Sequence, residues 1–405
     1  MCHNEKEGGR KVFNKLVRMN NSTSKIFFFL AGLFILGYLL LVYAQSEHVK
    51  LMPIDSTATP FDASFHFGGL LLMGFFVAIA LAFRGYMLLK GYSYTIMIFA
   101  AVSVAMYYPS YFVSVGGFKF SKLIVPLLQL IMFGMGTALS WKDFTRVLQM
   151  PKGVIVGVLC HYTVMPFVGW TVTQIFAFPP EIAAGIILIG SCPNGLASNV
   201  MTFLARGNLA LSITLTAIST LIAPLVTPMF MKLLAGQFVP VDFWDMVWHI
   251  TQIIVLPIGA GLIFNHFLHG KFKWLDAVMP LVSMISIALI IVVITSAGRN
   301  DLLLVGKLLV VAVLMHNITG YVLGYWISRG LRMSEKDCRT LALEVGLQNG
   351  GLASGIALKM GKLATVGLAA AVFGPTMNIT GSSLALWWRS RTPPEDQETD
   401  ERHHE

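Results

Sequence analysis

The chain has 405 residues, of which 56% are hydrophobic and only 12% are charged, and its formal net charge is +9. Soluble globular proteins carry about 25% charged residues, so this composition excludes a mainly soluble protein, and no basic stripe indicates nucleic-acid binding. The apolar runs are long, do not alternate with polar residues, and contain Gly and Pro. They favour membrane-spanning helices over the short alternating strands of an outer-membrane barrel.

Twelve apolar segments can be drawn as membrane spans. They lie at residues 26–44, 67–89, 93–113, 120–140, 153–176, 182–205, 209–234, 246–268, 277–298, 303–328, 338–358 and 363–388. Of the 29 Lys and Arg residues, 21 fall on the side of the N-terminus, which predicts a cell-membrane protein with both termini in the cytoplasm. The first span ends at Val42-Tyr43-Ala44, a weak match to a signal-peptidase site, but its apolar run favours a retained anchor.

The last ten spans fall into two halves of five, at residues 92–235 and 246–390. Because five is odd, the second half is predicted to enter the bilayer upside down, and inverted repeats place a substrate site at the midplane where they meet. Residues 1–91 form a cytoplasmic leader and two appended spans, interpreted as regulatory or structural. Residues 391–405 are hydrophilic and are predicted to be a disordered cytoplasmic tail.

A polar motif occurs once in each half, inside a predicted span. Residues 194–198 read NGLAS and residues 349–354 read NGGLAS, an offset of about 155 residues that also aligns His161 with His316. Asn-Gly is a turn pair, and Pro193 before the first copy removes a backbone donor. Each motif therefore predicts a broken helix, which at membrane depth must be buried in protein or line a cavity.

Glu344 is the one acidic residue of 20 that lies well inside an apolar span. A charged side chain in hydrocarbon costs at least about 2.5–3.5 kcal/mol, so an intramembrane acid is a functional candidate. Gln348 lies one turn later on the same helix face, and a Gly-Gly pair follows it, which favours a break with free backbone carbonyls. The alternative interpretation is a satisfied hydrogen-bond cluster between helices.

The first half supplies further oxygen donors. Ser212 and Thr216 are one turn apart and share a helix face, although such hydroxyls more often bond to carbonyls of their own helix. Sodium takes hard oxygen ligands, and the N-terminal ends of half-helices favour an anion. We therefore expect co-transport of a cation and an organic anion. Sodium and proton coupling both stay open here, because one carboxylate can serve either.

Two histidines also lie inside spans. For His316 we favour hydrogen-bonded packing, whereas for His161, which precedes the local break at Met165-Pro166, a ligand role and packing are equally open. The sequence contains no GxSxG, P-loop or HExxH motif and no metal-type Cys spacing. No catalytic residue, enzyme activity or obligate protein partner is therefore predicted.

At these residues the chain resembles the bile acid:sodium symporter family. The resembling segments are residues 130–136 (LIMFGMG), 192–202 (CPNGLASNVMT), 204–208 (LARGN), 316–317 (HN), 344–349 (EVGLQN) and 378–382 (NITGS). The resemblance implies an all-α integral membrane protein with a ten-helix inverted five-plus-five repeat, divided into panel and core domains and containing two crossed discontinuous helices. The N-terminal two-helix hairpin is an addition to that plan in a bacterial-type member.

The resemblance also implies two Na+ sites. The first would be formed by Ser198, Asn199, Ser212, Thr216 and Glu344. The second would be formed by Glu344, Gln348, the carbonyls of Val345 and Leu347, and His161. Bacterial relatives carry Gln at the position of His161, and an imidazole is a poorer sodium donor that can be protonated. We expect the second site to be weaker or pH-sensitive.

Substrate contacts are predicted at Asn194, Gly195, Leu196, Asn349 and Asn378. Relatives often carry Gly-Gly-Thr where this chain has Asn-Gly-Leu, and a His before the last Asn is replaced by Met377. These departures argue against bile acid itself and leave a small organic anion. The expected function is sodium-coupled symport by alternating access, and the alternative is a proton-coupled or uniport organic-anion carrier that uses Glu344 or His161.

Overall fold

The computed structural model describes residues 21–51, 61–86, 89–140, 143, 145–268 and 273–395. Most of these residues are helical, because a helix satisfies its own backbone groups where water is absent. The predicted leader at residues 1–20 and the tail beyond residue 395 lie outside the described residues. The chain divides into two compact units, with the boundary between Tyr111 and Phe112.

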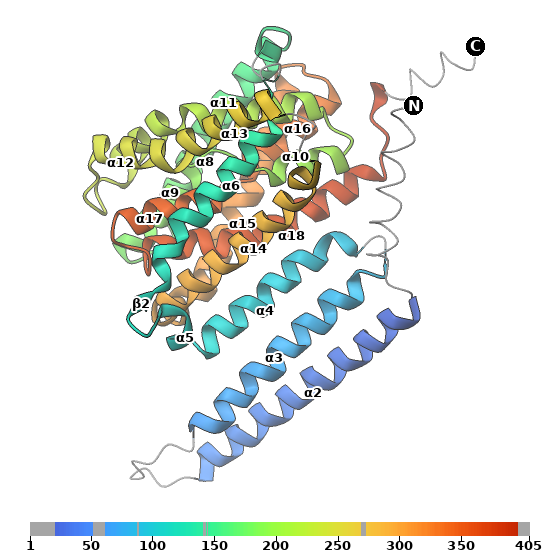
Figure 1. Ribbon diagram of the computed structural model, residues 1–405, viewed down its shortest axis with the longest axis vertical. Helices are drawn as coiled ribbons and strands as arrows, with labels where there is room; N and C mark the ends of the chain where they lie inside the picture. Colours follow the sequence, from blue (N-terminus) through green and yellow to red (C-terminus); the bar gives the residue numbers. More distant parts are fainter. Residues whose placement is uncertain are drawn as a thin grey trace. The chain divides into compact units, whose positions relative to one another are not determined.

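The first unit is a layer of helices formed by α2 (Asn21–Leu51), α3 (Phe61–Phe83), the short η1 (Lys90–Tyr92) and α4 (Ser93–Tyr107). α3 packs along both α2 and α4 (Figure 1). Gly69 makes one close approach possible, because a Cβ there would lie 2.6 Å from the Cβ of Tyr107. The hydroxyl groups of Tyr38 and Tyr107 are 2.9 Å apart and link α2 with α4.

Short elements connect this layer to the second unit. They are α5 (Ser110–Val113), β1 (Ser114–Val115), β2 (Phe118–Lys119) and η2 (Phe120–Leu123). β1 and β2 pair antiparallel through a turn in which Gly116 and Gly117 have φ values of +56° and +80°. Two consecutive positive φ values are typical of a type I′ hairpin turn, and this hairpin is the one sheet among the described residues.

The second unit contains the long helices that carry the predicted site. In chain order they are α6 (Ile124–Ala138), η3 (Arg146–Leu148), α8 (Pro151–Ile175), α9 (Pro180–Ser191), α10 (Ala197–Leu204), α11 (Leu209–Phe230), η4 (Met231–Ala235), α12 (Phe243–Ile250), η5 (Thr251–Val255), α13 (Leu256–Leu268), α14 (Lys273–Ala297), α15 (Arg299–Gly330), α16 (Glu335–Gly346), α17 (Gly350–Lys359) and α18 (Val366–Arg389). The turns η4 and η5 are π-helical.

The most extensive helix–helix contacts within the second unit fall into two groups. In one group, α6 packs chiefly against α13 and α14. In the other, α15 packs along α8, α16 and α18, and α9 contacts both α8 and α18. The groups meet through fewer contacts, mainly α11 with α12, α6 with α17, and α14 with α18.

Seven helices among the described residues are long and apolar enough to cross a membrane. They are Ser22–Tyr43, Phe120–Ala138, Pro151–Ile175, Leu209–Ala235, Phe243–Phe267, Val278–Ala297 and Arg299–Gly330. The spans drawn at 182–205 and 338–358 are absent from this set because each is interrupted, α9 ending before α10 and α16 before α17. The protein is therefore a multi-pass, essentially all-α membrane protein.

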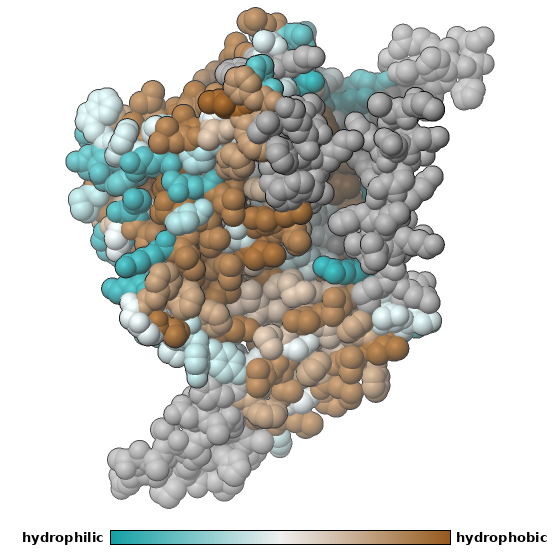
Figure 2. Space-filling model, viewed as in Figure 1, coloured by the Kyte–Doolittle hydropathy of each residue, from teal (hydrophilic) through white to brown (hydrophobic). Residues whose placement is uncertain are grey.

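Large apolar side chains cover the outer faces of these helices. Leu225 is 57% exposed and Leu304 is 80% exposed, and Figure 2 shows hydrophobic residues over much of the visible surface. Exposed apolar surface on this scale would be unfavourable in water. It fits contact with the hydrocarbon of a bilayer, and it leaves the buried polar residues of the second unit as the notable feature.

Candidate functional site

The first helix break follows α9. Its C-cap residue, Cys192, is extended with φ −76° and ψ 156°. Pro193 comes next and has no N–H with which to continue the helix. The chain becomes helical again only at Ala197, where α10 begins. The break therefore lies where Pro193 and the Asn-Gly pair predicted it.

The second break separates α16 from α17. Leu347, the C-cap of α16, is extended with φ −92° and ψ 126°. Asn349 is the N-cap of α17, and its Oδ1 accepts a hydrogen bond from the backbone N–H of Leu352 at 3.0 Å. An Asn at this position satisfies one of the N–H groups that a helix start leaves unpaired. The NGG motif thus stops one half-helix and begins the next.

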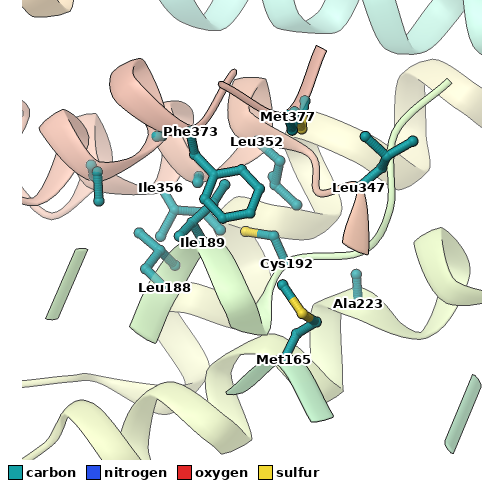
Figure 3. Packing of buried hydrophobic residues seen from close by; sticks show 14 of the residues in the cluster. Met165, Leu188, Ile189, Cys192, Ala223, Leu347, Leu352, Ile356, Phe373 and Met377 are labelled. Atoms are coloured by element: carbon teal, nitrogen blue, oxygen red, sulfur yellow. The ribbon is translucent and has the colours of Figure 1, made fainter. Parts of the chain in front are cut away.

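The two breaks contact each other directly. The backbone N–H of Asn349 donates to the carbonyl oxygen of Pro193 at 2.9 Å. A Cβ at Gly195 would lie 3.4 Å from the carbonyl oxygen of Gln348, which puts the two breaks in van der Waals contact. Figure 3 shows Cys192 and Leu347, one from each break, in the same buried apolar cluster. The interrupted helices therefore meet at their breaks.

Glu344 is buried beside this junction, with 1% of its surface exposed. Its Oε1 accepts a hydrogen bond from Ser212, and its Oε2 accepts one from the hydroxyl of Thr216 at 3.3 Å. None of the ion pairs between described residues includes Glu344. Within the described part of the chain, the carboxyl group therefore has neutral oxygen groups as its partners and no cationic side chain.

Helix α10 completes the same cluster. The Oδ1 of Asn199 is 2.7 Å from the hydroxyl of Ser212 and 3.4 Å from that of Thr216. The hydroxyl of Ser198 lies 3.4 Å from that of Thr216. The five residues of the first predicted set therefore come together from α10, α11 and α16. A hydroxyl carries one proton, so Ser212 can donate to Glu344 or to Asn199 but not to both at once.

The second predicted set lies at the end of α16. The side-chain N–H of Gln348 donates to the carbonyl oxygen of Val345 at 2.8 Å. The other side-chain atom, Oε1, is buried and has no hydrogen-bond partner among the described residues. An unpaired buried acceptor costs about 1–3 kcal/mol, which makes this oxygen available to a cation. Leu347 is buried and extended next to it.

His161, on α8, bridges the two interrupted helices. Its Nδ1 is 3.0 Å from the carbonyl oxygen of Glu344, and its Nε2 is 2.9 Å from the carbonyl oxygen of Cys192. Both partners are acceptors, whereas a neutral imidazole has a single N–H. A neutral His161 can therefore satisfy one carbonyl only, and it fills the space between the C-terminal ends of two half-helices.

Four of the five predicted substrate contacts lie at the joined breaks. Asn194 is buried, and its Oδ1 accepts from the hydroxyl of Ser219 at 2.6 Å. Gly195 and Leu196 are partly exposed, and Asn349 caps α17. The fifth, Asn378, lies on α18 and donates to its own helix at Gly374 O, with no hydrogen bond to either break within the described part of the chain.

Some residues that hold the second break had no role assigned from the sequence. Asn317, on α15, donates to the carbonyl oxygen of Gly346 at 2.8 Å and accepts from the hydroxyl of Thr380 on α18. Tyr321 is 3.2 Å from the same hydroxyl. Asn317 and Thr380 both lie in segments that carried the family resemblance, and that was the only signal available. These contacts fix the last carbonyl of α16.

Comparison with known proteins identifies the relatives of this chain. A family model described as the sodium bile acid symporter family matches residues 125–305. An uncharacterized sodium-dependent transporter of Bacillus subtilis is 41% identical over 272 residues, which cover 67% of this chain and 84% of the relative. The chain belongs to the bile acid:sodium symporter family.

Plant members of the symporter family are also similar. A probable chloroplastic sodium/metabolite cotransporter of Arabidopsis thaliana is 35% identical over 266 residues, which cover 66% of each chain. A probable chloroplastic sodium/metabolite cotransporter of rice, Oryza sativa subsp. japonica, is 32% identical over 309 residues, which cover 75% of this chain and 74% of the relative.

Proposed function

We propose that this symporter-family member couples sodium to the movement of a small organic anion, with Glu344 as the central sodium ligand. The observation that carries the proposal is a buried carboxyl group with only neutral partners beside two joined helix breaks. Burial of an uncompensated charge in a membrane is unfavourable, so a cation is the partner that this position lacks. The relatives described as sodium-dependent transporter and sodium/metabolite cotransporter support sodium and a small-molecule cargo.

The first sodium would bind in the cluster of α10, α11 and α16. Its ligands would be Ser198, Asn199, Ser212, Thr216 and Glu344, each of which already lies within hydrogen-bonding distance of at least one other member of the set. Each hydroxyl has two acceptor lone pairs as well as its proton. When sodium enters, the hydroxyl groups would turn their lone pairs toward the ion. The carboxylate would then contact the positive charge of sodium in place of the hydrogen-bond donors Ser212 and Thr216.

The second sodium would bind at the end of α16. The unpaired Oε1 of Gln348 supports this position, together with the carbonyls of Val345 and Leu347 and the carboxylate of Glu344. The carbonyl of Val345 is already engaged by Gln348, and His161 offers a nitrogen instead of an oxygen. We therefore propose a weaker second site.

The anion would bind where α10 and α17 begin. Free N–H groups and the positive end of the helix dipole favour negative charge at both starts. Asn194, Gly195, Leu196 and Asn349 lie there, and we keep Asn378 as the contact from α18. Sodium beside Glu344 would remove the repulsion between the carboxylate and the anion. Each ligand would then raise the affinity for the other by the same factor.

The proposed architecture is a ten-helix inverted repeat. By sequence order the halves would be α4, α6, α8, α9–α10, α11 and then α12–α13, α14, α15, α16–α17, α18, with the break in the fourth span of each. The group around α6, α13 and α14 would belong to the panel, and the group around α15 would form the core. Rocking of these groups would give alternating access, with both termini in the cytoplasm.

A thermal-shift screen of purified protein in nanodiscs tests the proposal. Small mono- and dicarboxylic acids are added in sodium chloride or in choline chloride, and we expect at least one acid to raise the melting temperature in sodium only. Uptake of that acid into proteoliposomes should then follow an imposed sodium gradient. Uptake that follows a pH gradient and ignores sodium would instead identify a proton-coupled carrier.

A further inference from the structure

A leucine from one helix group fits against two glycines of the other. Gly351 and Gly355 lie one turn apart on α17, the half-helix that starts at the second break. A Cβ at Gly351 would be 2.9 Å from the Cδ2 of Leu128, and a Cβ at Gly355 would be 2.5 Å from its Cδ1. Leu128 belongs to α6 and is completely buried. The missing side chains of α17 therefore create the space that Leu128 fills.

Ile253 closes the same contact from η5. Its Cδ1 would be 3.5 Å from a Cβ at Gly355, and it is 1% exposed. The π-turn has a specific cause: the N–H of Leu256 donates to the carbonyl of Thr251, and the following Pro257 has no N–H. The carbonyl of Gln252 is thereby left without its usual backbone donor.

A side chain from α6 supplies a hydrogen-bond donor to that carbonyl. The amide of Gln129 donates to the carbonyl oxygen of Gln252 at 3.2 Å. Gln129 follows Leu128 in sequence, and Gln252 precedes Ile253. One hydrogen bond therefore joins the two segments that carry these apolar side chains.

A cavity lies farther along α17. It has a volume of about 250 Å³ and is lined by residues of both groups, including Asp245 and Met246 on α12 and Ile356 and Lys359 on α17. Ile356 and Lys359 follow Gly355, so the cavity is on the side of the Leu128 contact that is remote from the break. Its walls carry opposite charges on the two helix groups.

We propose that Leu128 and Ile253, seated against Gly351 and Gly355, form a gate between the site at the breaks and this cavity, which is the entrance on one face of the membrane. The inference depends on the proposed alternating access, because a gate on one face requires the site to open to the other. A glycine surface suits a gate, since a side chain can pack closely against it and can move away without steric obstruction from other side chains. The gate is closed in this structure.

The test uses Met246→Cys as a reporter in nanodiscs, where a maleimide reaches both faces. Met246 lines the cavity but is only 5% exposed, so rapid labelling requires α12 and α17 to separate. Adding Gly355→Ala should raise the labelling rate by roughly tenfold, because an extra methyl overpacks the closed contact. Gly351→Ala should raise it less, since its Cβ has more room.

Two further variants separate the gate from general damage. Leu128→Val removes the δ carbons that the new methyl meets and should return labelling of the Gly355→Ala protein toward the parent rate. Gly374→Ala is the matched control: it adds a methyl where α18 meets α14, but the nearest atom, Cδ1 of Ile291, would be 3.8 Å away. It should leave labelling unchanged. Protein without the reporter corrects for the native cysteines.

The outcomes are distinct. Equal labelling of the Gly355→Ala and parent proteins, or an equal rise with Gly374→Ala, overturns the gate. If Gly355→Ala does not fold, Gly351→Ala and Leu128→Ala provide the same test, because each disturbs the closed contact. The assay needs neither coupling nor substrate, so a labelling rise supports the gate even if the thermal-shift and uptake tests reject sodium coupling.

Discussion

The backbone N–H of Asn349 donates to the carbonyl of Pro193, and this bond of 2.9 Å joins the two helix breaks. Pro193 lies in the break, outside α9 and α10, so its carbonyl accepts from the N-cap N–H of α17 and not from a turn of its own helix. The two halves of the chain are therefore joined through their backbones at the point where Glu344 is buried. A ligand that orders one break must act on the other.

The hydroxyl groups on α11 give a first prediction. Thr216→Val should weaken sodium binding about tenfold, because it removes an oxygen that lies 3.3 Å from the carboxylate. Thr220→Val is the matched control, one turn later on α11, where the hydroxyl donates to the carbonyl of Thr216 at 2.6 Å and not to the carboxylate of Glu344. Isothermal titration with sodium chloride measures both. Equal effects of the two variants would exclude Thr216 as a ligand.

His161 gives a second prediction. His161→Gln should retain or strengthen sodium coupling, because an amide oxygen is a better sodium ligand than an imidazole nitrogen. The amide N–H can still donate to the carbonyl of Cys192 or of Glu344, which the histidine contacts now. The effect is measured as the rise in melting temperature that a small organic acid causes in sodium chloride compared with choline chloride. Weaker coupling in the variant would show that the imidazole itself has a role in transport.

Leu196 gives a third prediction, about the substrate. Leu196→Thr should change the order in which small organic acids stabilise the protein, because it adds a hydroxyl at the partly exposed first break. Sodium affinity should change little, since Leu196 is not among the sodium ligands proposed above. A thermal-shift panel of acids and a sodium titration measure the two effects. A change in sodium affinity with an unaltered acid preference would show that Leu196 belongs to a sodium site and not to the substrate site.

Some of this site could be predicted because its signals are local. Pro193 and the Asn-Gly pairs break helices wherever they occur, and the spacing of Ser212 and Thr216 puts their hydroxyls on one face. Their convergence on Glu344 followed from the family resemblance and is found in the structure. The interruption of the spans at 182–205 and 338–358 was likewise readable from the motifs.

The remaining features depend on contacts between distant segments. Asn317 holds the carbonyl of Gly346 from another helix, and no pattern around Asn317 identifies that partner. The Gly350-Gly351 pair indicated a helix break in the sequence, whereas the packing of Gly351 and Gly355 against Leu128 requires the three-dimensional fold. His161 had two open interpretations, and only the structure shows both its nitrogens facing carbonyls.

Sodium binding to Glu344→Gln, followed by isothermal titration in nanodiscs, is the most direct measurement. The amide keeps the size of the side chain and its contacts with Ser212 and Thr216 but removes the charge, so sodium affinity should fall by at least about tenfold with the protein still folded. Glu181→Gln is the control, because that acid bonds instead to Lys362 and Thr365. Sodium affinity equal to that of the parent protein in Glu344→Gln would contradict a sodium site at this carboxylate.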